Sequence, residues 1–204
     1  MEILLLTPLI LITLTIISTF IRYLHIVYMN AKPKHQKEEL EIILFWKKNY
    51  WKTGFAIKRC YIKLFKYFEK KPFGITFEGV QIIIRHKNEI ILGKFDELRQ
   101  RTHMCEYDLG AAGMVCYGTS YIKSAQDELY EECGLKNKIT HKMTLSPSDG
   151  VNCLIHIFEC EIKDTQELKS DDGTFLSFIS MSKTRALNAN MKSDARIILN
   201  KYEL

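Results

Sequence analysis

The sequence lacks the cysteine spacing of metal-binding modules. Six cysteines are present, but no two are separated as C-x-x-C, and no histidine falls at a zinc-ligand offset from a cysteine pair. This excludes the zinc modules that such motifs define. The cysteines are expected to be ordinary reduced or buried residues, because a thiol nucleophile would need a positioned base that the sequence does not reveal.

Low-complexity tracts and short internal repeats are also missing, which excludes repeat arrays and compositionally biased linkers. The chain has 204 residues, of which 47% are hydrophobic and 26% charged. This is enough for one well-buried domain plus an appendage.

Charge is absent from residues 3–21, a run rich in Leu and Ile. As a helix these residues would span roughly 28 Å, close to the thickness of the bilayer's hydrocarbon core. We expect a retained membrane helix within a segment of residues 1–30. A signal peptide fits less well because the run lacks a basic start and a small-residue cleavage site. A buried core helix, or a wrongly assigned start, is the third interpretation.

The charges flanking this run predict its orientation. Arg22, Lys32, Lys34 and Lys37 follow it, whereas Glu2 precedes it, so the positive-inside rule places the C-terminal part in the cytosol. The chain is thus expected to be a single-pass membrane protein. The final residues 201–204 read KYEL, one substitution from a luminal retrieval signal, which leaves the ER lumen as the alternative.

Basic residues are concentrated in one segment between Glu41 and Lys71. It contains nine Lys or Arg and two Glu, a net charge of +7, so the rest of the chain sums to −2. Aromatic residues are interspersed, and from Cys60 onward they recur at helical spacing. We expect residues 31–73 to form a basic, aromatic helical linker that either contacts anionic membrane lipid or packs on the domain. No recognised nucleic-acid-binding module accompanies the charge, so nucleic acid is not an expected partner.

Strand-like runs follow a Pro-Gly boundary at residues 72–74. They cover residues 75–84 and 89–95, separated by the turn-forming pair Lys87-Asn88, with a third short run at residues 114–117. A helix is predicted next, with Ser120 as its N-cap and Gly134 just beyond its end. Its expected buried stripe consists of Ile122, Ala125, Leu129 and Cys133.

Carboxylates are crowded on that predicted helix. Glu131 and Glu132 are three and four residues after Glu128, so the three share one face, where like charges repel. A hard divalent cation would remove this conflict, and Mg²⁺ fits because it binds carboxylates together with substrate phosphates. An acidic, solvated helix face is the simpler interpretation of the spacing alone.

The stretch from residue 113 to 135 resembles the Nudix box, G-x5-E-x7-R-E-U-x-E-E-x-G-U, where U is a bulky aliphatic residue. The matching positions are Gly113, Glu128, Leu129, Glu131, Glu132, Gly134 and Leu135. Residues 107–113 resemble the strand and glycine turn that enter the box, and residues 151–162 and 174–176 resemble the closing strands. The resemblance covers roughly residues 74–204. It implies an α/β fold, the Nudix-type α/β/α sandwich with a mixed sheet, in a domain of residues 74–204.

Two positions depart from the box. Thr119 stands where the family has a glutamate, and Asp127 stands where it has an arginine. In the family these two side chains help to orient the metal-binding glutamates. Asp127 would therefore either join the metal ligands or mark decay of the site.

The resemblance implies hydrolysis of a nucleoside diphosphate linked to a further group, or of a related pyrophosphate-containing small molecule, with Mg²⁺ or Mn²⁺ as cofactor. It assigns Glu128, Glu131, Glu132 and the Gly113 carbonyl to the metal, with Glu131 and Glu132 as the catalytic pair. Arg99 and Arg101 are weaker candidates for binding phosphate. The candidates for the general base cannot be ranked from the sequence; they are Glu161, Asp164, Glu167, Asp171 and Asp172.

Three functional hypotheses remain open. The first is a membrane-anchored Nudix hydrolase. The second is a catalytically impaired Nudix-fold binding module at a membrane surface, which Thr119 and Asp127 motivate. The third is a membrane-surface interaction protein in which the match to the box is incidental.

Overall fold

One long strand, β3 (Ile75–His86), organises the sheet in this computed structural model, which describes residues 41–46, 52–58, 75–170 and 172–203. β3 pairs in parallel with β8 (Leu154–Ile162) and antiparallel with β4 (Glu89–Lys94) and β6 (Ala111–Met114). Three further strands are antiparallel additions: β7 (Ile139–Leu145) on β8, and β5 (Tyr107–Leu109) and β9 (Ser177–Met181) on β4. The predicted mixed sheet is therefore confirmed.

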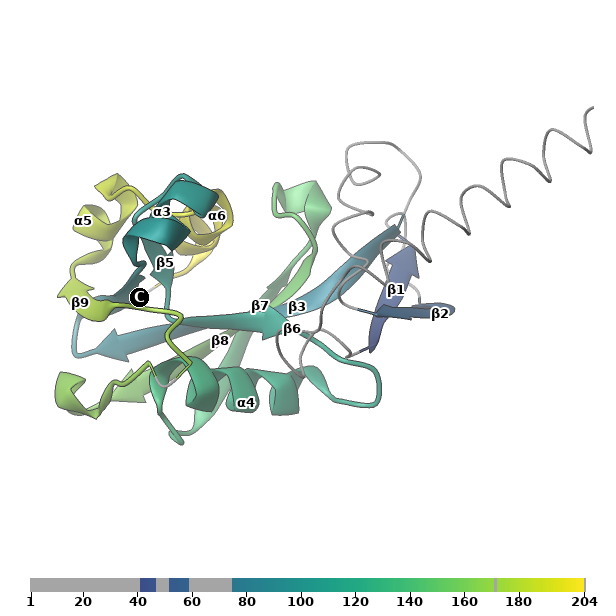
Figure 1. Ribbon diagram of the computed structural model, residues 1–204, viewed down its shortest axis with the longest axis horizontal. Coiled ribbons are helices and arrows are strands. Elements are labelled where there is room, and N and C mark those ends of the chain that lie inside the picture. The colour runs from purple at the N-terminus through teal and green to yellow at the C-terminus, as the bar shows by residue number, and fades with distance from the viewer. Residues whose placement is uncertain (1–40, 47–51, 59–74, 171, 204) are drawn as a thin grey trace, which may run out of the picture.

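Helices cover both faces of this sheet (Figure 1). The helix α4 (Tyr121–Cys133) lies on one face, and α5 (Lys183–Asn188) and α6 (Ser193–Lys201) lie on the other. A short helix, α3 (Glu97–His103), joins β4 to β5, and two 3-10 turns, η3 (Pro147–Asp149) and η4 (Thr165–Glu167), flank β8.

Alternation along the central strands produces two cores. Val80, Ile82 and Ile84 of β3 pack with α4, whereas Ile83, between the last two, packs with α5 and α6. Side chains of a strand point alternately to its two faces, so a run of β-branched residues can supply both cores at once. This is the α/β/α layering expected from the sequence.

The prediction of a helical linker is wrong for those of its residues that the structure describes. β1 (Glu41–Trp46) and β2 (Lys52–Lys58) are strands that pair with each other, and β1 also pairs with the start of β3. The sequence of β1, EIILFW, is rich in β-branched and aromatic residues, which favour strands, and the first residues of β3, before its pairing with β6 and β8 begins, supply the partner. The helical spacing seen from residue 60 onward lies outside the described residues.

The predicted membrane helix at residues 3–21 also lies outside the described residues. Within the ranges that the structure describes, no helix is both long and apolar enough to cross a bilayer.

Buried cysteines account for most of the thiols. Cys105, Cys133, Cys153 and Cys160 are buried in the described part of the chain. Burial raises the pKa of Cys133, and it raises that of Cys160 to about 11, so both remain protonated at neutral pH. This agrees with the expectation of ordinary core cysteines.

Candidate functional site

The helix that carries the box, α4, begins and ends as predicted. The Ser120 hydroxyl accepts a hydrogen bond from the Lys123 N–H, and Gly134 ends the helix with φ 71°, a conformation that glycine adopts without strain. Ala125, Leu129 and Cys133 are buried as expected. Ile122 is not: it is 47% exposed, because the neighbouring Tyr121 ring packs on the sheet instead, stacked 4.2 Å from the His156 ring.

Gly113 and Glu128 are in direct contact. A Cβ atom added at Gly113 would lie 2.1 Å from the carboxyl carbon and from Oε1 of Glu128, far inside van der Waals distance. β6, which contains Gly113, is fixed by its pairing with β3, and Glu128 is a buried residue of α4. The glycine is therefore required because only a residue without a side chain lets this strand approach the carboxylate.

Glu132, one helical turn further on, is held by the same strand. The Ala112 N–H donates to Glu132 Oε2 over 2.9 Å. The pKa of Glu132 is raised to about 8, chiefly by burial and also by the charges of Glu128, Asp172 and Asp108, against the opposing effect of the Ala112 hydrogen bond. Glu132 is thus a carboxyl group that keeps its proton at neutral pH unless positive charge arrives.

One lysine supplies positive charge beside this site. Lys192, the N-cap residue of α6, contacts the buried Asp108 of β5 at 2.6 Å. Burial alone would lower the pKa of Lys192, but Asp108 outweighs it and Glu132 adds to the effect, so the pKa is raised. Sequence reasoning missed this pair because 84 residues separate its members.

The donor chemistry of this region fits a divalent cation. Glu128, Asp108 and Asp172 act on Glu132 through like charge, and all four offer hard oxygen ligands. In the ranges described, however, no three His, Cys, Asp or Glu side chains converge closely enough to hold a metal ion as they stand. The ligand roles of Glu128, Glu131, Glu132 and the Gly113 carbonyl therefore stay predictions, which require side-chain rotation when a cation binds.

Among the candidate bases, Asp172 is the carboxylate whose charge acts on Glu132. Its oxygens accept hydrogen bonds from the Thr174 N–H at 2.9 Å and the Thr174 hydroxyl at 2.6 Å, which fix it in the loop before β9. Glu161 is an exposed residue of β8, Asp164 caps η4, and Glu167 acts on Cys160. Asp171 lies outside the described residues.

The two arginine candidates lie on α3, which contains no buried residue. Arg101 is exposed and forms an i,i+4 ion pair with Glu97 at 3.8 Å. Arg99 is half-buried. Their role as phosphate ligands stays a prediction.

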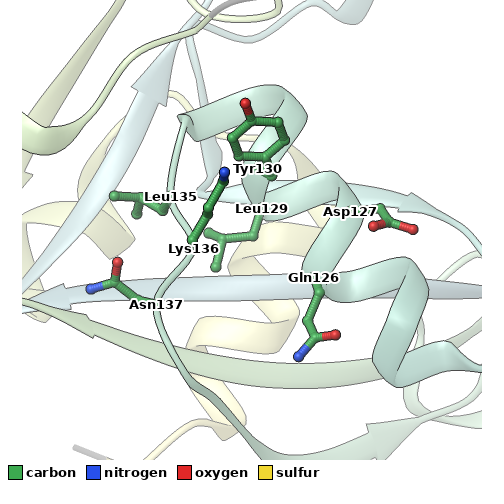
Figure 2. Close-up of a pocket in the computed structure, with 7 residues that line it drawn as sticks. All are labelled: Gln126, Asp127, Leu129, Tyr130, Leu135, Lys136 and Asn137. Atoms are coloured by element: carbon green, nitrogen blue, oxygen red, sulfur yellow. The ribbon is translucent and has the colours of Figure 1, made fainter.

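Asp127 does not belong to the acidic face of α4. It pairs with Lys123 at 2.5 Å, one turn earlier on the helix; the Lys123 side chain is exposed and that of Asp127 is half-buried. Asp127 also lines a cavity of about 280 Å³ with Gln126, Leu129, Tyr130 and residues 135–137, whose side chains are drawn in Figure 2. The Asp127 carboxylate is thus paired with Lys123, and this placement does not support a role as a metal ligand.

A hydrogen-bonded chain at the other end of α4 was also missed. His156 of β8 contacts Glu78 Oε1 at 2.6 Å through Nε2 and the Thr144 hydroxyl at 2.9 Å through Nδ1. His141 reaches the same hydroxyl at 3.2 Å. These polar residues come from three strands that are far apart in the sequence, and they form no motif. Only the pairing of the strands shows that they meet.

The fold is similar to those of several solved structures. DR0079 from Deinococcus radiodurans matches with a TM-score of 0.60 at 13% identity, over 79% of this chain and 97% of that chain. A putative Nudix hydrolase family member from Chromobacterium violaceum has a TM-score of 0.47 at 17% identity, over 61% of this chain and 74% of that one. The dihydroneopterin triphosphate pyrophosphohydrolase of E. coli has a TM-score of 0.49 at 12% identity, over 61% of this chain and 93% of that one.

The fold resembles the Nudix fold. No protein-family model and no curated protein matches the sequence. At these identities the likeness concerns the fold alone, so the chemistry of this Nudix-like chain must be argued from its own residues.

Proposed function

We propose that this chain is a membrane-anchored, metal-dependent hydrolase that cleaves the pyrophosphate bond of a nucleoside diphosphate linked to a further group, or of a related pyrophosphate. The observation that carries the proposal is the contact of Gly113 with Glu128, next to Ala112, whose N–H holds Glu132. Two helix carboxylates are thereby brought to one backbone segment. An acidic helix face with no function would not require a glycine at this contact.

Each residue of the site has a defined part in this proposal. Glu128 and Glu132 would hold Mg²⁺ or Mn²⁺ together with Glu131 and the Gly113 carbonyl. A metal held there would neutralise charge on the pyrophosphate oxygens and lower the pKa of the attacking water. Because Glu132 is protonated at neutral pH without a cation, metal binding releases its proton. Asp172, the carboxylate that acts on Glu132, accepts the proton of the water.

A second candidate function is a Nudix-fold binding module without turnover. It is favoured by the lack of three converging ligands in the described ranges and by Asp127, which pairs with Lys123 where the box has an arginine. On this alternative the acidic site binds metal or nucleotide, and no bond is cleaved.

Cleavage of a panel of pyrophosphates into two phosphate-containing products, followed by chromatography, separates the two candidates. The full chain should hydrolyse at least one nucleoside diphosphate derivative or dinucleotide with Mg²⁺ or Mn²⁺, at about 1–1,000 per second, the range of ordinary enzymes. EDTA should stop the reaction. Folded protein that binds Mn²⁺ but cleaves the P–O–P bond of no compound would establish the binding module instead.

We also propose that residues 3–21 hold the chain in a membrane, with the Nudix-like domain on the cytosolic side where the basic flank lies. The ER lumen is the alternative location. The full chain should stay in the membrane pellet after alkaline extraction, whereas a chain starting at residue 41, which retains β1, should be released. Release of the full chain would contradict the anchor, and protease protection of the domain in sealed vesicles would favour the lumen.

A further inference from the structure

Gln81 occupies the middle of the central strand β3 with its side chain buried. Its amide nitrogen donates to two backbone carbonyls, those of Leu109 and Ala111, the latter at 3.1 Å. An amide nitrogen has two hydrogens, so both are used on the residues either side of Gly110.

The backbone needs this support because it changes partner at Gly110. The preceding strand, β5, pairs with β4, and the following strand, β6, pairs with β3. Gly110 has φ +28°, and a Cβ added there would lie 2.3 Å from the Ile82 carbonyl oxygen, so the chain is in direct contact with β3 where it crosses from one partner strand to the other. Carbonyl groups at such a crossing cannot all keep ladder partners, and buried carbonyls need a donor.

The residues just after this crossing touch the acidic site. Ala112 donates to Glu132, and Gly113 lies against Glu128. We propose that Gln81 is a positioning residue: by clamping Leu109 and Ala111, it fixes the backbone of Ala112 and Gly113 and thereby the directions of the two carboxylates. The effect on turnover rests on the proposed function, whereas the effect on the backbone does not.

Gln81→Met is the direct test because methionine has a similar length and no donor. The kcat should fall about 10- to 100-fold, since misplacement of reacting groups by about 1 Å costs up to about 100-fold. The KM should stay within about threefold, because Gln81 does not touch substrate in the proposal. The Mn²⁺ concentration for half-maximal activity should rise. Hydrogen exchange of the Ala112 amide should quicken about tenfold or more, while amides of α6 keep their rates.

Two further variants serve as a control and as a milder substitution. Gln100→Met removes a similar hydrogen bond, from a glutamine Nε2 to the Phe95 carbonyl at 2.7 Å on α3, and should leave kcat and Ala112 exchange at wild-type values. Gln81→Asn keeps the amide but shortens its reach. It should show the same changes to a smaller degree, and it replaces Gln81→Met if that protein does not fold.

Wild-type exchange at Ala112 in the Gln81 variants would overturn the proposal, whatever their activity. So would faster exchange combined with an unchanged kcat in an active enzyme, or exchange that quickens equally over the whole protein. If the wild-type chain hydrolyses nothing, the proposed function fails, and Ala112 exchange measured against that of α6 still decides whether Gln81 fixes this backbone.

Discussion

Gly113→Ala is expected to lower kcat by about 100-fold or more, because the new methyl group occupies the place of the Glu128 carboxylate. The added Cβ would lie 2.1 Å from Glu128 Oε1, so either the carboxylate turns away or β6 moves from β3. A displacement of about 1 Å at reacting groups is enough for a loss of this size. Overpacking should also cost about 1–3 kcal/mol of unfolding free energy. Steady-state kinetics and denaturant unfolding measure the two effects.

Gly118→Ala is the matched control. Gly118 has φ +78°, and a Cβ atom added there meets no heavy atom within 4 Å. Its substitution should cost about 1 kcal/mol through backbone strain alone and leave kcat unchanged. A Gly113→Ala enzyme that is as active as the wild type would show that the contact with Glu128 has no catalytic importance.

Glu132→Gln is expected to abolish activity and yet to stabilise the metal-free protein above neutral pH. The lost carboxylate is proposed to hold the metal and should reduce kcat by about 1,000-fold, within the range of losses reported for oriented catalytic groups. Glutamine keeps an oxygen that accepts the Ala112 N–H, so the fold should be retained. The loss of activity would then be separate from any loss of structure.

The stability effect follows from the proton on Glu132. Its pKa is about 8 in the folded chain and 4.5 as the ordinary value, so the folded state binds more protons between these two pH values. Stability of the wild type therefore falls as pH rises from about 4.5 to about 8, by roughly 2–5 kcal/mol. Glutamine has no such proton, and the difference between the two proteins isolates this contribution.

Urea unfolding at pH 5 and pH 8, with EDTA or with Mg²⁺, measures how the Glu132 proton contributes to the free energy of unfolding. Wild type should lose stability at pH 8 relative to Glu132→Gln, and Mg²⁺ should restore wild type only. Glu89→Gln, an exposed change whose single amide oxygen can still accept from the Ser180 hydroxyl, should follow the wild type throughout. Parallel pH curves for wild type and Glu132→Gln would mean that Glu132 is an ordinary ionised carboxylate.

The sequence was sufficient where structure is decided locally. Ser120 and Gly134 predicted both ends of α4 because capping depends on one residue at each end. The β3–β4 hairpin followed from Lys87-Asn88 between two β-branched runs, and Lys87 does adopt a positive φ of 56°. The spacing of Glu128 and Glu132 followed from helix geometry alone.

The contacts that shape the site were beyond the sequence because they join distant segments. Gln81 looked like one polar residue in a strand, and its role depends on where the chain crosses at Gly110. Lys192 and Asp108 meet only after the sheet and α6 have formed. The expected linker helix failed for a related reason: β1 is stabilised by pairing with β3, a partner that helical periodicity does not consider.

The central claim is that the carboxylates at Gly113 hold a metal ion for attack of water on a pyrophosphate. The measurement that tests it most directly is ³¹P NMR of the full chain with its best substrate and Mg²⁺ in ¹⁸O-water. With the wild type we expect the P–O–P resonances to disappear and one phosphate product to carry one ¹⁸O. With Glu132→Gln we expect the P–O–P resonances to remain and no ¹⁸O to be incorporated. Intact P–O–P resonances in the presence of folded wild-type protein with Mg²⁺ bound would contradict it.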